Sequence, residues 1–327
     1  MAPAAPVHPR HRRGLRLALR VLVSAVLIGI LVSRIHFDDF VPRRHGSGTW
    51  WFLGAGIALM ALSFVVAAWR WQRVIAVFGH RVPLRTLVKH SLAGQFVGNV
   101  LPSTVGGDVL RVSRSSTDIG DTTTAFAAVL LERLTGFVVL PLLVFVGFAL
   151  DPSLLDTKRS GLALVIAVVT LVALGVVLFL AGHPRAAGRF AEHDNWMRAI
   201  GAVHVGVDRL RRDPRDAAGA LVAATAYQLT VISSVYCAFH VVDVRVANGA
   251  VLAFVAAVAM AQVVPITLGG LGVREGLLAL FLHPLGVSTG QAVAIGLLWY
   301  GILLLVSLLG APAFAVGHRH RTRVPTP

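Results

Sequence analysis

The chain has 327 residues, of which 56% are hydrophobic and 14% are charged, and its formal net charge is +15. Soluble globular domains are typically about 45–50% apolar and about 25% charged, so this composition excludes an ordinary soluble protein and indicates a polytopic membrane protein. The 28 Arg and 2 Lys residues are explained by an excess of positive charge in cytoplasmic loops that face anionic lipid. We therefore expect no nucleic-acid partner. The single Cys237 excludes an intrachain disulfide and a cysteine-cluster metal site, and we predict no metal and no cofactor.

The apolar segments predict an all-α membrane helix bundle with one membrane domain, residues 15–317. A basic cytoplasmic tail precedes it at 1–14, and a second basic cytoplasmic tail follows at 318–327. About six full spans are expected, at roughly 15–33, 50–69, 125–150, 161–182, 217–241 and 288–317. We expect the protein in the inner (cytoplasmic) membrane, with both termini in the cytoplasm.

Two shorter apolar stretches, 84–101 and 247–264, end in loops that contain Pro and Gly. Twenty basic residues lie in the N-terminal tail, segment 70–90, segment 183–216 and the C-terminal tail, whereas six lie in the alternate loops. The positive-inside rule is obeyed only if both short stretches return to the side that they entered. The charges therefore predict two re-entrant hairpins, within an inverted repeat around 84–122 and 247–286, the first entering from the cytoplasm and the second from outside.

Segment 190–212 has a different pattern, because apolar residues recur at helical spacing among Arg and Asp residues. Its apolar positions are Trp196, Ile200, Val203, Val207 and Leu210. The spacing predicts an amphipathic helix, which lies either on the cytoplasmic interface or against the bundle.

The two loops repeat one motif. "NVLPSTVGGDVLR" (99–111) and "QVVPITLGGLGVR" (262–274) share the pattern [NQ]-x-x-P-x-T-x-G-G-x-x-x-R without gaps. Proline ends a helix because it lacks an N–H, and glycine permits positive φ and a close backbone approach. Paired broken helices in opposite orientations are typical of transporters and indicate where the substrate binds.

The motif also supplies groups that bind anions. Free N–H groups at the start of each second helix, together with Arg111 and Arg274, suit a lipid phosphate in a common chamber. Two other interpretations stay open: the glycines serve tight helix packing, or the arginines form structural ion pairs. Asp108 either caps its helix or meets a cationic headgroup.

Charges inside "LLERLTG" are a further signal, because Glu132 and Arg133 fall within an apolar span. Intramembrane charges are costly and mark functional candidates. Glu132 either pairs with Arg111 or contacts substrate, and Glu275 is the corresponding residue of the second copy. The candidate headgroup and phosphate site is Asn99, Ser103, Thr104, Gly106, Gly107, Asp108, Arg111, Glu132, Arg133, Gln262, Thr267, Gly269, Gly270, Arg274 and Glu275, with no catalytic residue.

The stretches "NVLPSTVGGDVLR", "LLERLTGF" and "PITLGGLGVREG" resemble the lysylphosphatidylglycerol synthase transmembrane, or flippase-like, family over about residues 15–317. The resemblance implies a bacterial or archaeal inner-membrane protein. In longer relatives this region moves an aminoacylated phospholipid between leaflets, and a C-terminal cytosolic domain makes that lipid. Here the sequence ends about ten residues after the last predicted span, so we do not expect lysyl transfer.

Three functions remain. The first is a non-enzymatic lipid flippase or lipid-binding transporter for an anionic, aminoacylated or polyprenyl-phosphate-linked lipid. The second is a membrane enzyme acting on a lipid phosphate, for which only Asp108 and Glu132 are plausible acids or bases. The third is an anchor for a separate lipid-modifying enzyme. The sequence favours the first, with membrane lipid as the partner.

Overall fold

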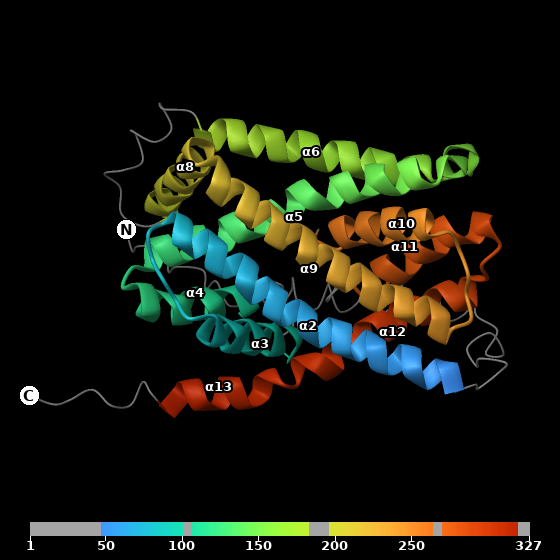
Figure 1. Cartoon of the computed structure of the whole chain (residues 1–327), viewed down its shortest axis with the longest axis horizontal. Coiled ribbons are helices and arrows are strands. Elements are labelled where there is room, and N and C mark those ends of the chain that lie inside the picture. Colours follow the sequence, from blue (N-terminus) through green and yellow to red (C-terminus); the bar gives the residue numbers. More distant parts are fainter. Residues whose placement is uncertain (1–46, 101–105, 183–195, 264–269, 320–327) are drawn as a thin grey trace, which may run out of the picture.

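The computed structural model describes residues 47–100, 106–182, 196–263 and 270–319. Within these ranges the chain consists of helices and short connections without a strand, which confirms the predicted all-α class. The long helices run beside one another along the longest axis of the molecule (Figure 1).

Five described helices are long and apolar enough to cross a membrane. They are α2 (Ser47–Val77), α5 (Thr122–Leu150), α6 (Gly161–Gly182), α9 (Pro214–Val241) and α12 (Thr289–Ser307). These helices confirm the spans predicted at 50–69, 125–150, 161–182 and 217–241. The span predicted at 15–33 lies outside the described residues.

The span predicted at 288–317 was wrong as a single helix. Helix α12 ends at Ser307, and α13 (Gly310–Arg319) follows as a separate helix. Pro312 has no N–H to donate to the Leu308 carbonyl, so the regular ladder stops there. The Leu308 carbonyl instead accepts a bond from the Ala311 N–H at 3.0 Å, which makes a tighter turn.

Two helical hairpins replace full spans, as the repeated motif predicts. The first pairs α3 (Leu84–Val100) with α4 (Gly106–Ile119), and the second pairs α10 (Asn248–Ala261) with α11 (Val273–Leu282). At about 1.5 Å per residue these helices are roughly 15–26 Å long, short of the roughly 30 Å hydrocarbon core. Each hairpin therefore turns back inside the bundle.

The hairpins enter from opposite ends, which confirms their predicted inversion. Helix α5 begins directly after α4, where the Asp121 side chain accepts bonds from the N–H groups of Thr123 and Thr124. The far end of α5 packs against the first turn of α10, since a Cβ on Gly249 would lie 2.6 Å from the Gly147 carbonyl oxygen. The two hairpins thus open at the two ends of the same helix (Figure 1).

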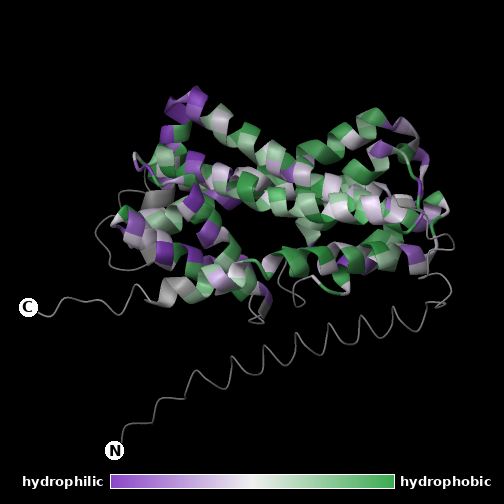
Figure 2. Ribbon diagram, turned by 60° about the horizontal axis from the view of Figure 1, so that its bottom comes forward, coloured by the Kyte–Doolittle hydropathy of each residue, from purple (hydrophilic) through white to green (hydrophobic). Residues whose placement is uncertain are grey.

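Helix α8 (Trp196–Arg212) is amphipathic as predicted, and it packs on the bundle. A Cβ on Gly206 would lie 2.6 Å from the Phe78 ring and 3.0 Å from Leu131, and the Arg209 side chain donates to the Val77 carbonyl at 2.9 Å. Hydrophobic residues dominate the middle of the bundle, and hydrophilic residues are densest at the end that carries α4 and α8 (Figure 2).

Candidate functional site

A buried ion cluster lies where the first hairpin meets α2 and α5. Glu132 lies 11 residues after the Asp121 cap, about 16 Å along α5, and its exposed fraction is 1%. Its Oε1 accepts a bond from Arg70 Nε of α2 at 2.8 Å, and its Oε2 accepts one from Arg111 Nη2 of α4 at 3.2 Å. The carboxylate therefore joins two arginines that are distant in sequence.

Close helix packing brings Arg111 to this position. A Cβ on Gly107 would collide with the carbonyl oxygen of Gly94, and a Cβ on Gly94 would lie 2.8 Å from Arg111 Cγ. Both residues must be glycine for α3 and α4 to approach this closely. In the first copy of the motif, Gly107 thus serves helix packing within α4 rather than a turn with positive φ.

A second carboxylate extends the cluster toward its more exposed edge. Asp108 in the first turn of α4 pairs with Arg133 Nη2 at 2.5 Å and with Arg111 Nη1 at 3.6 Å. The side chain of Arg133 is 43% exposed, whereas that of Arg111 is 13% exposed. The cluster consists of three arginines and two carboxylates, and its formal charge is therefore +1. Its members are Arg70, Asp108, Arg111, Glu132 and Arg133.

Aromatic rings lie against the two deeper arginines. The Arg111 guanidinium carbon lies 4.2 Å from the Trp71 ring centroid, and that of Arg70 lies 4.5 Å from the Tyr227 ring centroid. Such faces attract a cation and replace part of its hydration. The two guanidinium groups are therefore held in fixed positions without full neutralisation by carboxylates.

Several hydrogen-bond donors of this region have no acceptor among the described residues. They are Arg111 Nε, Asn99 Nδ2 and Trp71 Nε1, each of which is buried. A buried donor without an acceptor costs about 1–3 kcal/mol. The unused donors and the charge of +1 both suit an added anionic acceptor.

The second hairpin has a smaller and more enclosed pair. Arg274 and Glu275 at the start of α11 are each 1% exposed, and Arg274 Nη2 donates to Glu275 Oε1 at 2.9 Å. Glu275 Oε2 also accepts the Gly272 N–H at 2.6 Å, and the Arg274 guanidinium carbon lies 4.9 Å from the Tyr300 ring centroid. This pair is formally neutral and its hydrogen bonds are largely internal.

The two copies of the motif differ at the turn. Gly270 and Gly272 have positive φ values of 78° and 86°, which glycine adopts without strain. A Cβ on Gly270 would lie 2.9 Å from the Gln262 side chain, so the first and ninth positions of the motif are in contact. The predicted site residues Ser103, Thr104, Thr267 and Gly269 lie outside the described residues, as do Pro102 and Pro265.

The structure brings only part of the predicted site together. Asp108, Arg111, Glu132 and Arg133 form one cluster, with Asn99, Gly106 and Gly107 on the same hairpin. Gln262, Gly270, Arg274 and Glu275 belong to the other hairpin. Arg111 and Arg274 share no partner among the described residues, so the chamber that both would line stays a prediction.

Sequence reasoning missed Arg70 and Trp71. The span was predicted to end at residue 69, and Arg70 was assigned to a cytoplasmic segment, but α2 continues to Val77 and buries both side chains. Trp69 and Trp71 flank Arg70 in the sequence, but neighbouring positions of a helix do not face each other. In the structure Trp69 lies against Arg73 and Trp71 against Arg111, so these tryptophans did not indicate the partner of Arg70.

A polytopic helical bundle with two helical hairpins and a buried ion cluster defines a multi-pass helical membrane protein. The sequence profile of the family described as "Lysylphosphatidylglycerol synthase TM region" matches residues 17–310, nearly the whole chain. The protein belongs to that lipid-related family. No curated protein matches the chain.

Proposed function

We propose that the protein is a lipid flippase or lipid-binding transporter rather than an enzyme. The first cluster would hold the phosphate of an anionic, aminoacylated or polyprenyl-linked lipid while its headgroup crosses the membrane. The observation that carries the proposal is the buried cluster of charge +1, together with Arg111 Nε and the neighbouring donors Asn99 Nδ2 and Trp71 Nε1, which have no acceptor among the described residues.

The physical argument is that a charged headgroup loses its hydration when it enters the bilayer. A site that replaces water must supply fixed donors and a compensating charge. Arg111 donates from a helix that starts only five residues earlier, so the positive end of the α4 dipole also faces this region. Arg133 and Asp108 at the exposed edge would then meet the acidic and basic groups of a zwitterionic headgroup.

The proposal also includes the orientation of the protein in the membrane, which follows from the distribution of basic residues. At the α8 end, Arg81 lies in the connection before α3, and Arg85 and Lys89 lie in the first turns of α3. Helix α8 itself ends in Arg209, Arg211 and Arg212. The positive-inside rule assigns this end to the cytoplasm of an inner membrane. The first hairpin would then admit lipid from the cytoplasmic side, and the second hairpin would open toward the opposite leaflet.

The test reconstitutes the full-length chain in phosphatidylcholine vesicles that contain a trace of fluorescent phosphatidylglycerol. Dithionite bleaches the outer-leaflet probe, and continued bleaching reports transfer from the inner leaflet. Glu132→Gln and Arg111→Gln should slow transfer at least about ten-fold, because each disrupts the arrangement of the two arginines. Arg73→Gln is the matched control, since Arg73 is an exposed arginine on the same helix as Arg70.

Two results would contradict the proposal. One is transfer by Arg111→Gln at the wild-type rate in vesicles that contain folded protein. The other is chemical conversion of the probe lipid, which chromatography of the extracted lipid would detect and which would favour an enzyme. A fluorescent phosphatidylcholine probe tests whether the headgroup charge matters, because the cluster should prefer the anionic lipid.

A further inference from the structure

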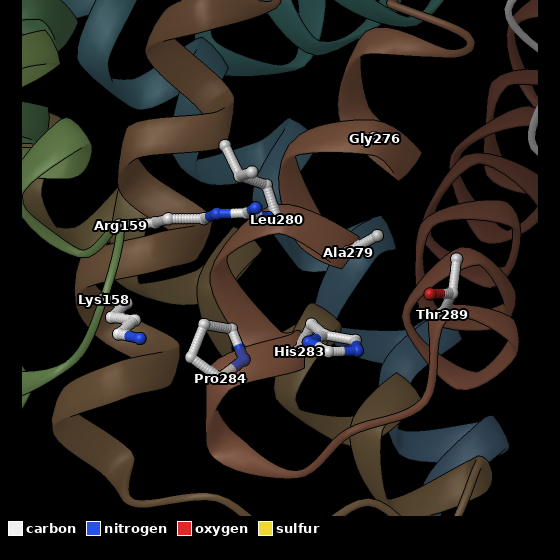
Figure 3. A pocket seen from close by; sticks show the side chains of 8 residues that line it. All are labelled: Lys158, Arg159, Gly276, Ala279, Leu280, His283, Pro284 and Thr289. Atoms are coloured by element: carbon white, nitrogen blue, oxygen red, sulfur yellow. The ribbon is translucent and has the colours of Figure 1, made fainter.

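A pocket of about 460 Å³ lies at the end of the bundle opposite α8. Its wall is formed by α11, by the short helix η3 (His283–Leu285) and by the start of α12, and its basic residues come from the connection before α6. Figure 3 shows the lining residues Lys158, Arg159, Gly276, Ala279, Leu280, His283, Pro284 and Thr289.

The lining combines cations with an apolar wall. Lys158 and Arg159 supply positive charge and Thr289 a hydroxyl, whereas none of the eight lining residues is acidic. The connections at this end, 151–160, 242–247 and 283–288, contain three Lys or Arg residues, and two of them line the pocket. Among these three described connections, the basic residues are therefore concentrated at one place.

The backbone at Arg159 is unusual, because its φ is +74°. A side chain other than glycine, asparagine or aspartate rarely adopts this region, and such strain is found where a side chain is used. The buried Ser160 hydroxyl fixes the turn by donating to the carbonyls of Leu154 and Thr157. The turn thus presents Lys158 and Arg159 at its surface, where both are exposed.

Gly276 leaves the pocket open from the other side. It lies inside α11, where glycine is unfavourable, yet a Cβ there would meet nothing within 4 Å. Close packing therefore does not explain this glycine, in contrast to Gly107 and Gly147. A side chain added at position 276 would start in open space at the wall of the pocket.

We propose that this pocket binds the phosphate group of an anionic phospholipid. The basic pair directly precedes α6, whose exposed valines Val165, Val169 and Val172 face outward from the bundle. Lys158 and Arg159 therefore lie at the level of lipid headgroups, with Ala279, Leu280 and Pro284 beside them to contact the glycerol and acyl carbons. The site is separate from the Arg70–Glu132–Arg111 cluster and does not depend on transport.

The experiment uses the full-length chain in phosphatidylcholine nanodiscs that contain a photoreactive phosphatidylglycerol. Crosslinked peptides are mapped by mass spectrometry, and the readout is the yield on segment 276–289. Arg159→Asn removes the guanidinium while keeping a residue that tolerates positive φ, and Gly276→Leu fills the pocket. Each should lower the yield at this segment on the order of ten-fold, the effect of losing a charge-assisted bond or the space for the ligand.

Three controls decide the result. Arg245→Gln removes a charge at the same end but outside the pocket, and Gly276→Ala adds a single methyl group, so both should keep the wild-type yield. Thermal unfolding of every variant establishes that it is folded. Equal yield in folded Arg159→Asn and Gly276→Leu, or an equal yield from photoreactive phosphatidylcholine, would overturn the proposal. Binding of inorganic phosphate at this pocket without any phosphatidylglycerol crosslink to segment 276–289 would assign the pocket to the free anion and also overturn the proposal.

Discussion

The two hairpins share a sequence motif, yet their charged clusters are organised differently. At the first hairpin, Glu132 of α5 joins arginines from α2 and α4, and the cluster carries a charge of +1 beside donors that have no acceptor among the described residues. In the second hairpin, Arg274 and Glu275 are adjacent in sequence and form a pair that is neutral overall, and each side chain is 1% exposed. A repeated motif therefore fixes the hairpin, whereas the surrounding helices decide whether its arginine is available to a ligand.

The difference between the two hairpins is tested most strongly at the buried Arg274–Glu275 pair. Arg274→Gln leaves the Glu275 carboxylate buried without its cation, so we expect the free energy of unfolding to fall by about 3–5 kcal/mol. The thermal midpoint of the full-length protein in detergent is the measurement. The double variant Arg274→Gln/Glu275→Gln is neutral and should recover much of that loss.

The corresponding arginine substitution in the first hairpin should lower the stability of the protein less. Arg111→Gln leaves Glu132 paired with Arg70, so the thermal midpoint should fall less than in Arg274→Gln. An equal loss of stability in the two hairpins would mean that both pairs are structural, and the proposed difference between them would be wrong.

The glycines provide a second contrast. Gly107→Ala places a methyl group against the backbone of Gly94, which cannot move without separating α3 from α4, and should cost about 1–3 kcal/mol or more. Gly270→Ala meets the movable Gln262 side chain, so its cost should be mainly that of the positive φ, about 1–2 kcal/mol. Thermal midpoints measure both.

Gly54→Ala is the reference for these variants, because a Cβ at Gly54 in α2 would meet nothing within 4 Å. It should leave stability unchanged or raise it slightly through helix propensity. If Gly107→Ala behaved like Gly54→Ala, the close contact between α3 and α4 would not be what positions Arg111.

Local signals in the sequence predicted the hairpins well and the ion cluster poorly. Proline, glycine pairs and apolar length act over a few residues, so the motif indicated both breaks and the charge balance indicated their inversion. The partner of Glu132 lies 62 residues away on α2, and only the packing of three helices brings Arg70 to it. The sequence offered Arg111 as a partner because both lie in conspicuous motifs, and it left open whether Glu132 pairs with Arg111 or contacts substrate.

The break between α12 and α13 shows that a local signal can also be overlooked. Pro312 stood within the predicted span, and its missing N–H was a possible sign of an interruption. Proline alone does not decide the matter, because Pro141 lies within the continuous helix α5. The chain after the break packs on the first hairpin, since a Cβ on Gly310 would collide with the Leu92 carbonyl of α3. Arg114 of α4 also donates to the Ala313 and Phe314 carbonyls, at 2.9 and 3.0 Å. Helix α13 is thus attached to the hairpin that carries Arg111.

The smallest effect is expected at the exposed edge of the first cluster. Asp108→Asn removes a pair with Arg133 that is partly solvated, so stability should change by about 1 kcal/mol or less. It raises the formal charge of the cluster from +1 to +2, because three arginines then face one carboxylate. If this cluster holds a lipid phosphate, the variant should retain anionic lipid more strongly and release it more slowly, and native mass spectrometry measures the retained lipid. Reduced retention would instead mean that Asp108 contacts a cationic part of the headgroup, since only a lost attraction could offset the added positive charge.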